Sequence, residues 1–212
     1  MQPRLNSLRH IGIDLDNTLI DYTAAYRCLA PNFDLSPNCN DRVSIRSALR
    51  PSGSDDQRWQ EFQTRLYTEG LAYASIADGA THLFETCANL GIQVSIVSHK
   101  TRSGPEMYGA KDLWKPAIDF LREQGFVPDR LGLTEVHFAE SLSMKIKRIK
   151  DLGIDAFIDD LPKVLLHPAW PNWTQRILYE PGPWQKRGEL WSAGFEQVAS
   201  SIGLSPASSR KC

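Results

Sequence analysis

Short apolar runs alternate along the chain with segments whose apolar residues recur at helical spacing. Residues 10–15 form such a run and 92–97 predict a buried strand, and three further strand candidates are residues 134–138, 155–158 and 175–179. Helices are expected between them, for example over 78–90, ended by Gly91, and from Asp112 onward, ended by Gly125. Strands separated by helices require right-handed crossovers, which give a parallel sheet covered on both faces. We therefore predict an α/β fold built on a doubly wound parallel sheet.

One long segment, residues 21–76, interrupts this alternation, because it contains helical patterns but no convincing strand. Within it Trp59, Phe62 and Leu66 fall on one helical face, and Gly70 is placed to end that helix. The segment is too long for an ordinary strand-to-helix connection, so we expect a small inserted helical cap. The predicted parts are a core over residues 1–20 and 77–205, a cap over 21–76, and a flexible tail over 206–212.

Composition excludes several classes of protein. The 212 residues include 24 Lys and Arg against 25 Asp and Glu, so no large basic field is available to bind nucleic acid or an anionic membrane. The four cysteines show no CxxC spacing, which argues against a zinc cage or a disulfide scaffold and favours a reducing compartment. No stretch approaches the roughly 18 apolar residues of a membrane span. We expect a soluble, cytoplasmic protein, and its oligomeric state stays open.

Polar residues with catalytic potential follow the predicted strands at their carboxyl ends. They are Asp14, Asp16, Ser98, Asp159 and Asp160, with Lys145 and Lys147 in the segment before the fourth strand. Ligands of doubly wound sheets bind at this edge. Four crowded carboxylates repel one another unless a cation neutralises them. An all-oxygen ligand set without His or Cys favours a hard ion, most simply Mg²⁺.

The two lysines differ in their place on the predicted helix over 141–153. At roughly 100° per residue, Lys145 falls inside the apolar stripe of the helix, whereas Lys147 faces water. A lysine on a buried face is costly without an anionic partner, so Lys145 is expected to reach Asp14 or a bound phosphate. The alternative is a side chain that runs along the edge of the stripe and carries its charge into solvent.

Four segments in order resemble the motifs of the haloacid dehalogenase superfamily. IDLDNTL at 13–19 resembles its DxDxT signature, and IVSHK at 96–100 is similar to its second motif, an apolar strand ending in Ser or Thr. A lysine and then FIDDLP at 157–162 are similar to the third and fourth motifs. The resemblance spans about residues 10–165, and the segment 21–76 lies where the family inserts its cap domain.

This resemblance implies hydrolysis of a small-molecule phosphate monoester through an aspartyl-phosphate. Asp14 would be the nucleophile, since its oxygen is anionic at neutral pH and needs no activating base. Asp16 would protonate the leaving alkoxide and later take a proton from water, and its backbone carbonyl would bind the metal. Dehalogenases and phosphonatases of the family lack an Asp at the position of Asp16, so its presence favours phosphate esters.

The remaining roles implied by the resemblance concern metal and phosphate binding. Mg²⁺ would be held by Asp14 and Asp159 together with the Asp16 carbonyl. Asp160 would not contact the ion but would position its direct ligands. Ser98 and Lys145 would hold the phosphoryl oxygens, with His99 as a further phosphate-binding residue.

Other interpretations remain open. Residues 14–18 could be an ordinary turn, the Asp159–Asp160 pair could cap a following helix, and Ser98 could bond only to loop backbone. A phosphotransferase or phosphomutase would use the same motifs, and a catalytically silent binding module could share the core. A group of tryptophans near the end of the chain is expected to form a satellite core rather than a stacking platform; it comprises Trp170, Trp173 and Trp184.

Overall fold

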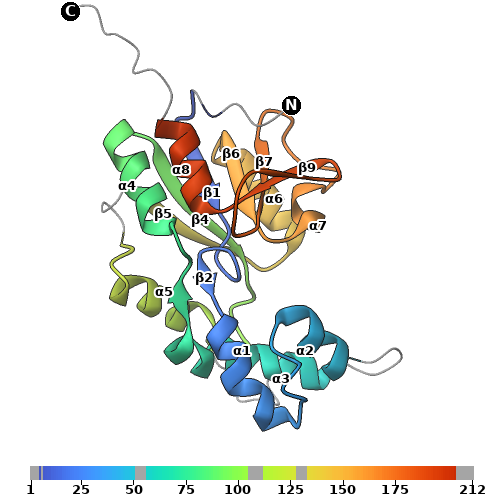
Figure 1. The fold of residues 1–212 in the computed structure, drawn as a ribbon. Coiled ribbons are helices and arrows are strands. Elements are labelled where there is room, and N and C mark those ends of the chain that lie inside the picture. Colours follow the sequence, from blue (N-terminus) through green and yellow to red (C-terminus); the bar gives the residue numbers. More distant parts are fainter. Residues whose placement is uncertain (1–4, 6, 51–55, 105–111, 128–132, 204–212) are drawn as a thin grey trace, which may run out of the picture. The chain divides into compact units, whose positions relative to one another are not determined.

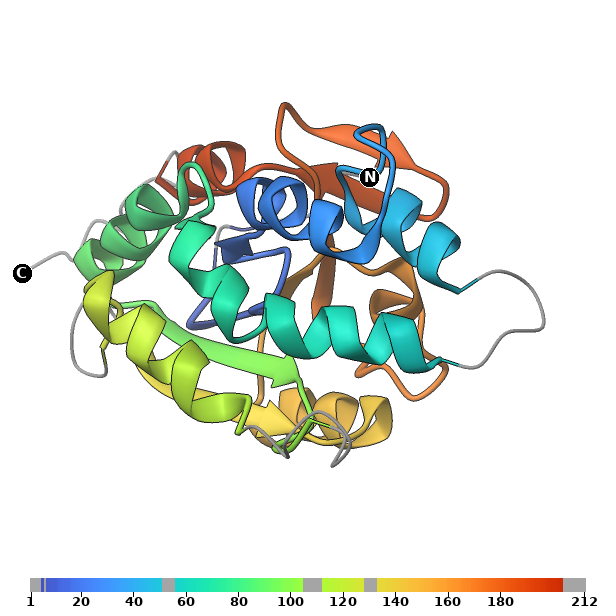
Figure 2. The ribbon, with the colours of Figure 1, turned by 90° about the horizontal axis from the view of Figure 1, so that it is seen from below.

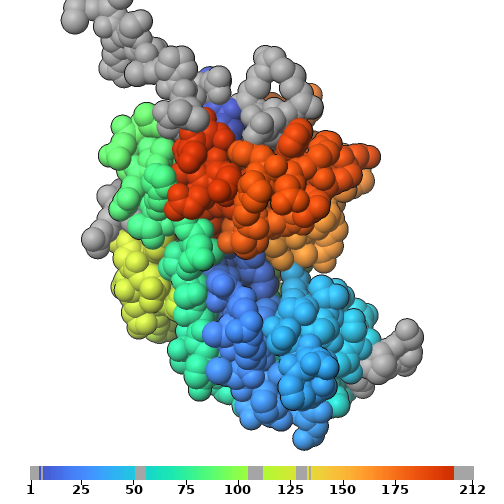
Figure 3. All heavy atoms as spheres, viewed as in Figure 1, coloured from blue at the N-terminus to red at the C-terminus, as the bar shows by residue number. Residues whose placement is uncertain are grey.

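The computed structural model in Figure 1 describes residues 5, 7–50, 56–104, 112–127 and 133–203, so the predicted tail over 206–212 lies outside the described residues. The chain divides into two compact units. The first comprises Met1–Leu19, Ala77–His99 and Phe126–Cys212, and the second comprises Ile20–Ile76 and Lys100–Gly125. The segments of both units can be followed by colour in the space-filling view of Figure 3.

The first unit is built on a mostly parallel seven-stranded sheet. Its strands, in spatial order, are β5 (Leu133–Ala139), β4 (Gln93–His99), β1 (His10–Ile13), β6 (Ala156–Asp159), β7 (Gln175–Tyr179), β9 (Leu190–Ala193) and β8 (Gln185–Arg187). Only β8 at the edge runs antiparallel to its neighbour. The five predicted strands are confirmed, and β8 and β9 are additional to them. The parallel order, with β1 between β4 and β6, confirms the doubly wound α/β class.

Helices cover both faces of this sheet. On one face α4 (Ala80–Leu90) contacts α8 (Phe195–Gly203), and on the other α6 (Leu142–Asp151) and α7 (Pro162–Leu165) pack against the strands, as Figures 1 and 2 show. The predicted stops are confirmed at Gly91 and Gly125, whose φ angles of 69° and 84° lie in the left-handed region that glycine adopts without strain.

The core beneath α6 and α7 contains one of the three tryptophans considered above. Trp170 is buried in a cluster with Phe157, Ile149 and Val164. Trp173 is 50% exposed and belongs to no core, whereas Trp184 is partly buried and its indole N–H donates to the Ser201 hydroxyl at 3.0 Å. The three tryptophans therefore do not form the expected satellite core, because Trp170 belongs to the core on a face of the main sheet.

The second unit is mainly helical. Its elements are β2 (Ile20–Asp21), α1 (Thr23–Leu29), η1 (Ala30–Phe33), α2 (Arg42–Leu49), α3 (Gln57–Leu66), η2 (Glu69–Tyr73), β3 (Ser75–Ile76) and α5 (Trp114–Glu123). The sequence pattern predicts no strand here, yet β2 and β3 form a short antiparallel pair at the two ends of the insertion. The pair is only two residues long on each side, too short for a periodic pattern.

A buried aromatic face holds this unit together. As predicted, Trp59, Phe62 and Leu66 are all buried on one face of α3, where Phe62 stacks on Tyr26 with ring centroids 6.2 Å apart. Gly70 does not end this helix, so that prediction is wrong. The helix ends at Leu66, and Gly70 lies within η2, closely surrounded by the side chains of neighbouring helices.

The second unit also takes in a segment that the sequence pattern assigns to the core. The helix α5 contacts η2 within this unit, and it buries Ala117, Phe120 and Leu121. Its apolar face is as regular as that of a helix covering a sheet, so periodicity alone does not show which partner it packs against.

Among the helices that the structure describes, none combines the length and the apolar composition that a membrane span requires.

Candidate active site

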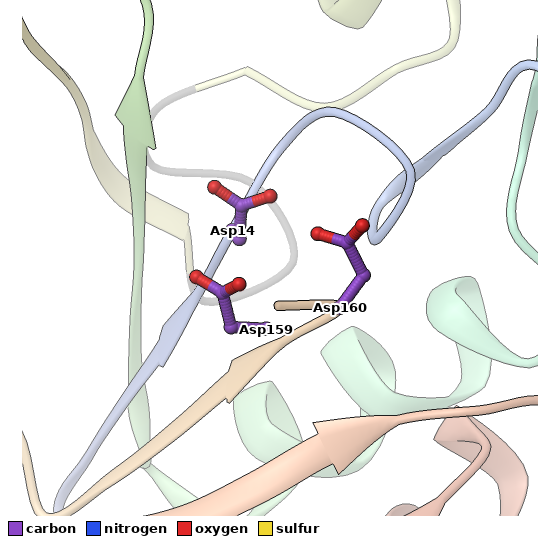
Figure 4. A group of neighbouring side chains, drawn as sticks. All are labelled: Asp14, Asp159 and Asp160. Carbon is purple, nitrogen blue, oxygen red and sulfur yellow. The ribbon is translucent and has the colours of Figure 1, made fainter. Parts of the chain in front are cut away.

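Three carboxylates meet at the carboxyl edge of the sheet. Asp14 directly follows β1, Asp159 is the last residue of the neighbouring strand β6, and Asp160 follows it. The two strands pair in parallel with Gly12 opposite Phe157, so Asp14 and Asp159, each two residues further on, lie on the same face of the sheet. Each of the three residues offers a carboxylate oxygen, and these oxygens all lie within 4.8 Å of one another (Figure 4).

Lys145 reaches this group of carboxylates from α6. Ser141 caps the start of that helix by accepting a hydrogen bond from the Met144 N–H at 3.2 Å. The Lys145 ammonium donates to Asp14 Oδ1 at 2.5 Å and to Asp159 Oδ2 at 2.6 Å, and the side chain is only 2% exposed. The expected contact with Asp14 is therefore found, and the alternative in which this lysine extends into solvent is excluded.

Lys147 behaves as the helical register predicts. Its side chain is 73% exposed and pairs with Asp151 at 2.6 Å, one turn further along α6. Two lysines only two positions apart are thus buried in one case and exposed in the other, because they lie on opposite faces of one helix.

Thr18 joins the loop after β1 to the end of β6. Its hydroxyl donates to Asp14 Oδ2 at 3.4 Å and accepts the Asp160 backbone N–H at 3.1 Å, and the residue is fully buried. The backbone N–H of Asp14 donates to the Ile158 carbonyl at 2.9 Å, which continues the pairing of the strands up to the site. Thr18 is not among the predicted site residues, although it is the threonine of the DxDxT pattern.

The loop between Asp14 and Thr18 is a tight turn, but it does more than reverse the chain. Asn17 has a φ angle of 63°, in the left-handed region that Asn tolerates better than most residues. Asp16 is buried in the same turn. The Asp14 carboxylate is buried against Lys145, which a residue that only formed a turn would not need. Turn formation alone therefore does not explain why an aspartate occupies position 14.

The carboxylate of Asp159 is engaged on both oxygens. Oδ2 accepts from Lys145, and Oδ1 accepts the backbone N–H of Leu161 at 2.8 Å, just before α7 begins. Leu161 is itself the N-cap residue of α7, and in the described part of the chain no side chain bonds to the first turn of that helix, so the capping role considered above is not found. Asp160 contributes its own carboxylate to the group from the loop that follows β6.

Ser98 and His99 lie at the carboxyl end of β4, next to β1. Ser98 is buried, and the His99 side chain is exposed. Partial desolvation lowers the pKa of His99, and the positive charges of Lys145 and Lys163 lower it further. Among the described residues, neither side chain bonds to the three carboxylates, so Ser98 and His99 share the edge of the sheet with them but not their hydrogen-bond network.

The electrostatics of the site follow from burial and from the charge imbalance. Burial raises the pKa of Asp14, Lys145 opposes that rise, and the charges of Asp159 and Asp160 add to it. Burial by itself would lower the pKa of Lys145, but Asp14 and Asp159 overcome this effect and raise that pKa above its usual value. Three carboxylates face one ammonium, and oxygen donors of this kind suit a hard divalent cation such as Mg²⁺.

Comparison with known proteins identifies the fold. No protein-family model matches the sequence, and no curated protein matches it. A haloacid dehalogenase-like hydrolase from Streptococcus pneumoniae is similar in structure, with a TM-score of 0.60 and 12% identity over 91% of this chain and 96% of that one. A hydrolase of the same family from Deinococcus radiodurans, with bound phosphate and sodium, has a TM-score of 0.56 and 11% identity over 93% and 98% of the two chains. A predicted phosphatase from Clostridium acetobutylicum has a TM-score of 0.54 and 14% identity over 93% of both chains.

At such low identities these likenesses establish the fold alone. The chain has the haloacid dehalogenase-like fold, with the carboxylates and Lys145 at the carboxyl edge of its parallel sheet.

Proposed function

We propose that the protein is a Mg²⁺-dependent phosphatase that hydrolyses a small-molecule phosphate monoester through an aspartyl-phosphate on Asp14. The observation that carries this proposal is the buried contact of Lys145 with both Asp14 and Asp159 at the carboxyl edge of a haloacid dehalogenase-like sheet. The names of the structurally similar proteins, hydrolases and a predicted phosphatase, and the phosphate bound to one of them support the same reaction class.

In this reaction Asp14 attacks the phosphorus atom and the ester oxygen leaves with the phosphorus–oxygen bond electrons. Asp16 gives that oxygen its proton, and it then removes a proton from the water that attacks the aspartyl-phosphate and releases inorganic phosphate. Lys145 keeps the Asp14 carboxylate in place and supplies positive charge beside the transferred group, and Ser98 holds a phosphoryl oxygen. His99 is a further proposed donor to the phosphate at the same edge of the sheet.

The residues present fit a bound Mg²⁺ ion. When bound, the ion would offset the repulsion between the attacking carboxylate and the phosphate. Asp14 and the Asp16 carbonyl are proposed ligands, as the resemblance implies. For the third, Asp159 is the expectation from sequence, but both its oxygens accept short hydrogen bonds, at 2.6 Å from Lys145 and at 2.8 Å from Leu161, whereas Asp14 Oδ2 accepts only a long bond of 3.4 Å from Thr18. We therefore propose that Asp160 contacts the metal ion directly and that Asp159 holds the Lys145 ammonium in place.

Titration of Mg²⁺ against activity tests this assignment. The Asp160→Asn variant should need much more metal for half-maximal activity, and Asp159→Asn should lower the maximal rate with a smaller change in metal requirement. The opposite pattern would restore Asp159 as the direct ligand.

We further propose that residues 21–76 act as a cap that selects the substrate. In support of this, Ile20 pairs with Ile76 and Asp21 with Ser75 in an antiparallel ladder. The first and last residues of the insertion are thus hydrogen-bonded side by side, as expected for a segment that folds as a separate inserted unit.

Phosphate release from an aryl phosphate and from a panel of phosphorylated metabolites tests the function. Release should require Mg²⁺, should stop on addition of a metal chelator, and should be abolished in Asp14→Asn. Wild-type activity in Asp14→Asn would refute the mechanism, and transfer of the phosphoryl group to an added alcohol without free phosphate would make the protein a phosphotransferase.

A further inference from the structure

An aromatic ring lies beside the charged end of Lys145. The Lys145 nitrogen is 5.2 Å from the ring centroid of Phe157, within the range of a cation–π interaction. Phe157 is fully buried in β6, two residues before Asp159, and it faces the same side of the sheet. The strand that supplies a carboxylate to the ammonium therefore also supplies a π face to it.

The position of this ring depends on a glycine in the neighbouring strand. Gly12 pairs with Phe157, and a Cβ atom at Gly12 would come within 2.4 Å of Cδ2 and 2.8 Å of Cε2 of the ring. The ring is held from another side by Trp170 in an edge-to-face contact, with centroids 6.0 Å apart. Phe157 thus extends across β1 into space that only a glycine leaves open.

The ring complements the two carboxylates that bind the ammonium. Two of the three N–H donors of Lys145 are directed to Asp14 and Asp159. Among the described residues, Phe157 provides a third electron-rich partner, and burial makes the attraction stronger than at an exposed site. An aliphatic residue would fill the same space without attracting the charge.

We propose that Phe157 is a positioning residue that holds the Lys145 ammonium in place throughout the reaction. This inference rests on the proposed function, in which Asp14 loses its negative charge on forming the aspartyl-phosphate. At that stage the negative charge beside Lys145 moves from the Asp14 carboxylate to the phosphoryl oxygens, whereas the attraction of the ring is unchanged because the ring takes no part in the chemistry. Gly12 belongs to the same arrangement, because it leaves the space in which the ring lies.

A pair of matched variants separates positioning from packing. Phe157→Leu removes the ring at this site. Phe84→Leu removes an equally buried ring of α4, which packs edge-to-face on Phe126 at 4.8 Å and has no role in the site. Both variants should lose similar stability, but only Phe157→Leu should lose kcat for an aryl phosphate, by about tenfold, which corresponds to roughly 1.4 kcal/mol. Equal kcat values in the two variants would overturn the proposal.

Fluorinated phenylalanines at position 157 provide a test that does not depend on the fold surviving a large change. Successive fluorine atoms withdraw electron density from the ring while nearly preserving its shape, so kcat should fall stepwise with fluorination at Phe157 and stay constant with the same series at Phe84. A flat response at Phe157 would show that the ring only fills space.

A third measurement needs no enzymatic activity. Reaction of each lysine with an amine-acylating reagent, followed by peptide mass spectrometry, reports how firmly Lys145 is held. Its labelling should be slow in the wild type and several-fold faster in Phe157→Leu, with no change in Phe84→Leu. Unchanged labelling in Phe157→Leu would refute the positioning role, whereas absence of phosphatase activity in the wild type would refute only the proposed function.

Discussion

Replacing Lys145 by methionine should destabilise the protein severely. The substitution keeps most of the buried side-chain volume and removes the ammonium that bonds to Asp14 at 2.5 Å and to Asp159 at 2.6 Å. Removal of one partner from a buried ion pair costs about 3–5 kcal/mol, because the remaining charge loses its compensation without regaining water. Here two hydrogen-bonded carboxylates are left, with Asp160 close to them, so we expect a loss within that range.

The matched control is Lys147→Met on the opposite face of the same helix. Lys147 pairs with Asp151 in solvent, and an exposed pair four residues apart on a helix contributes only about 0.3–0.5 kcal/mol. Urea unfolding of both variants in metal-free buffer measures the difference, and added Mg²⁺ should reduce the loss in Lys145→Met by supplying positive charge to the carboxylates. A loss below about 1 kcal/mol in Lys145→Met, or equal losses in the two variants, would refute the reasoning.

Three further predictions concern the fold around the site. Gly12→Ala should cost about 1–3 kcal/mol in urea unfolding because its Cβ would lie 2.4 Å from Phe157, and an unchanged midpoint would contradict the packing described. Asn17→Val should be about 1–2 kcal/mol less stable than Asn17→Gly at a φ of 63°, and equal stability of the two variants would show that the turn is not constrained. Burial lowers the pKa of His10, so only the unfolded chain takes up its proton near pH 6.5; stability should therefore fall as the pH is lowered from about 7 through 6.5, and the fall should be smaller in His10→Gln. A stability that rises as the pH is lowered over this interval, or a pH dependence that is the same in His10→Gln, would contradict the lowered pKa of His10.

The central sheet could be predicted from sequence because its strands are buried on both faces. Such strands appear as nearly continuous apolar runs, and the run at 92–97 overlaps β4, whose five central residues are all buried. The edge strand β8 could not be found in this way, because Gln185–Arg187 consists of three exposed polar residues whose strand conformation comes from pairing with β9. The packing of α5 against η2 could not be predicted either, because a regular apolar face shows that a helix is covered but not which element covers it.

Parts of the site could be predicted where a cost in free energy depended only on local geometry. Lys145 was distinguished from Lys147 by helical spacing and by the penalty for burying a charge, both of which are independent of the tertiary fold. The order of Asp159 and Asp160 could not be derived, because adjacent residues offer the same chemistry until the hydrogen bonds around each one are known. The contacts of Thr18 likewise depend on the approach of β6 to the loop after β1.

Detection of phosphate covalently bound to Asp14 tests the central claim most directly. The Asp16→Asn variant lacks the group that activates water, so incubation with an activated aryl phosphate and Mg²⁺ should let the intermediate accumulate. Intact-mass and peptide mass spectrometry after acid quenching should then find one added phosphoryl group on the peptide that contains Asp14, and none when Asp14→Asn is combined with Asp16→Asn. Phosphate release by the wild type without any such adduct, or an adduct that persists in the double variant, would contradict Asp14 as the nucleophile.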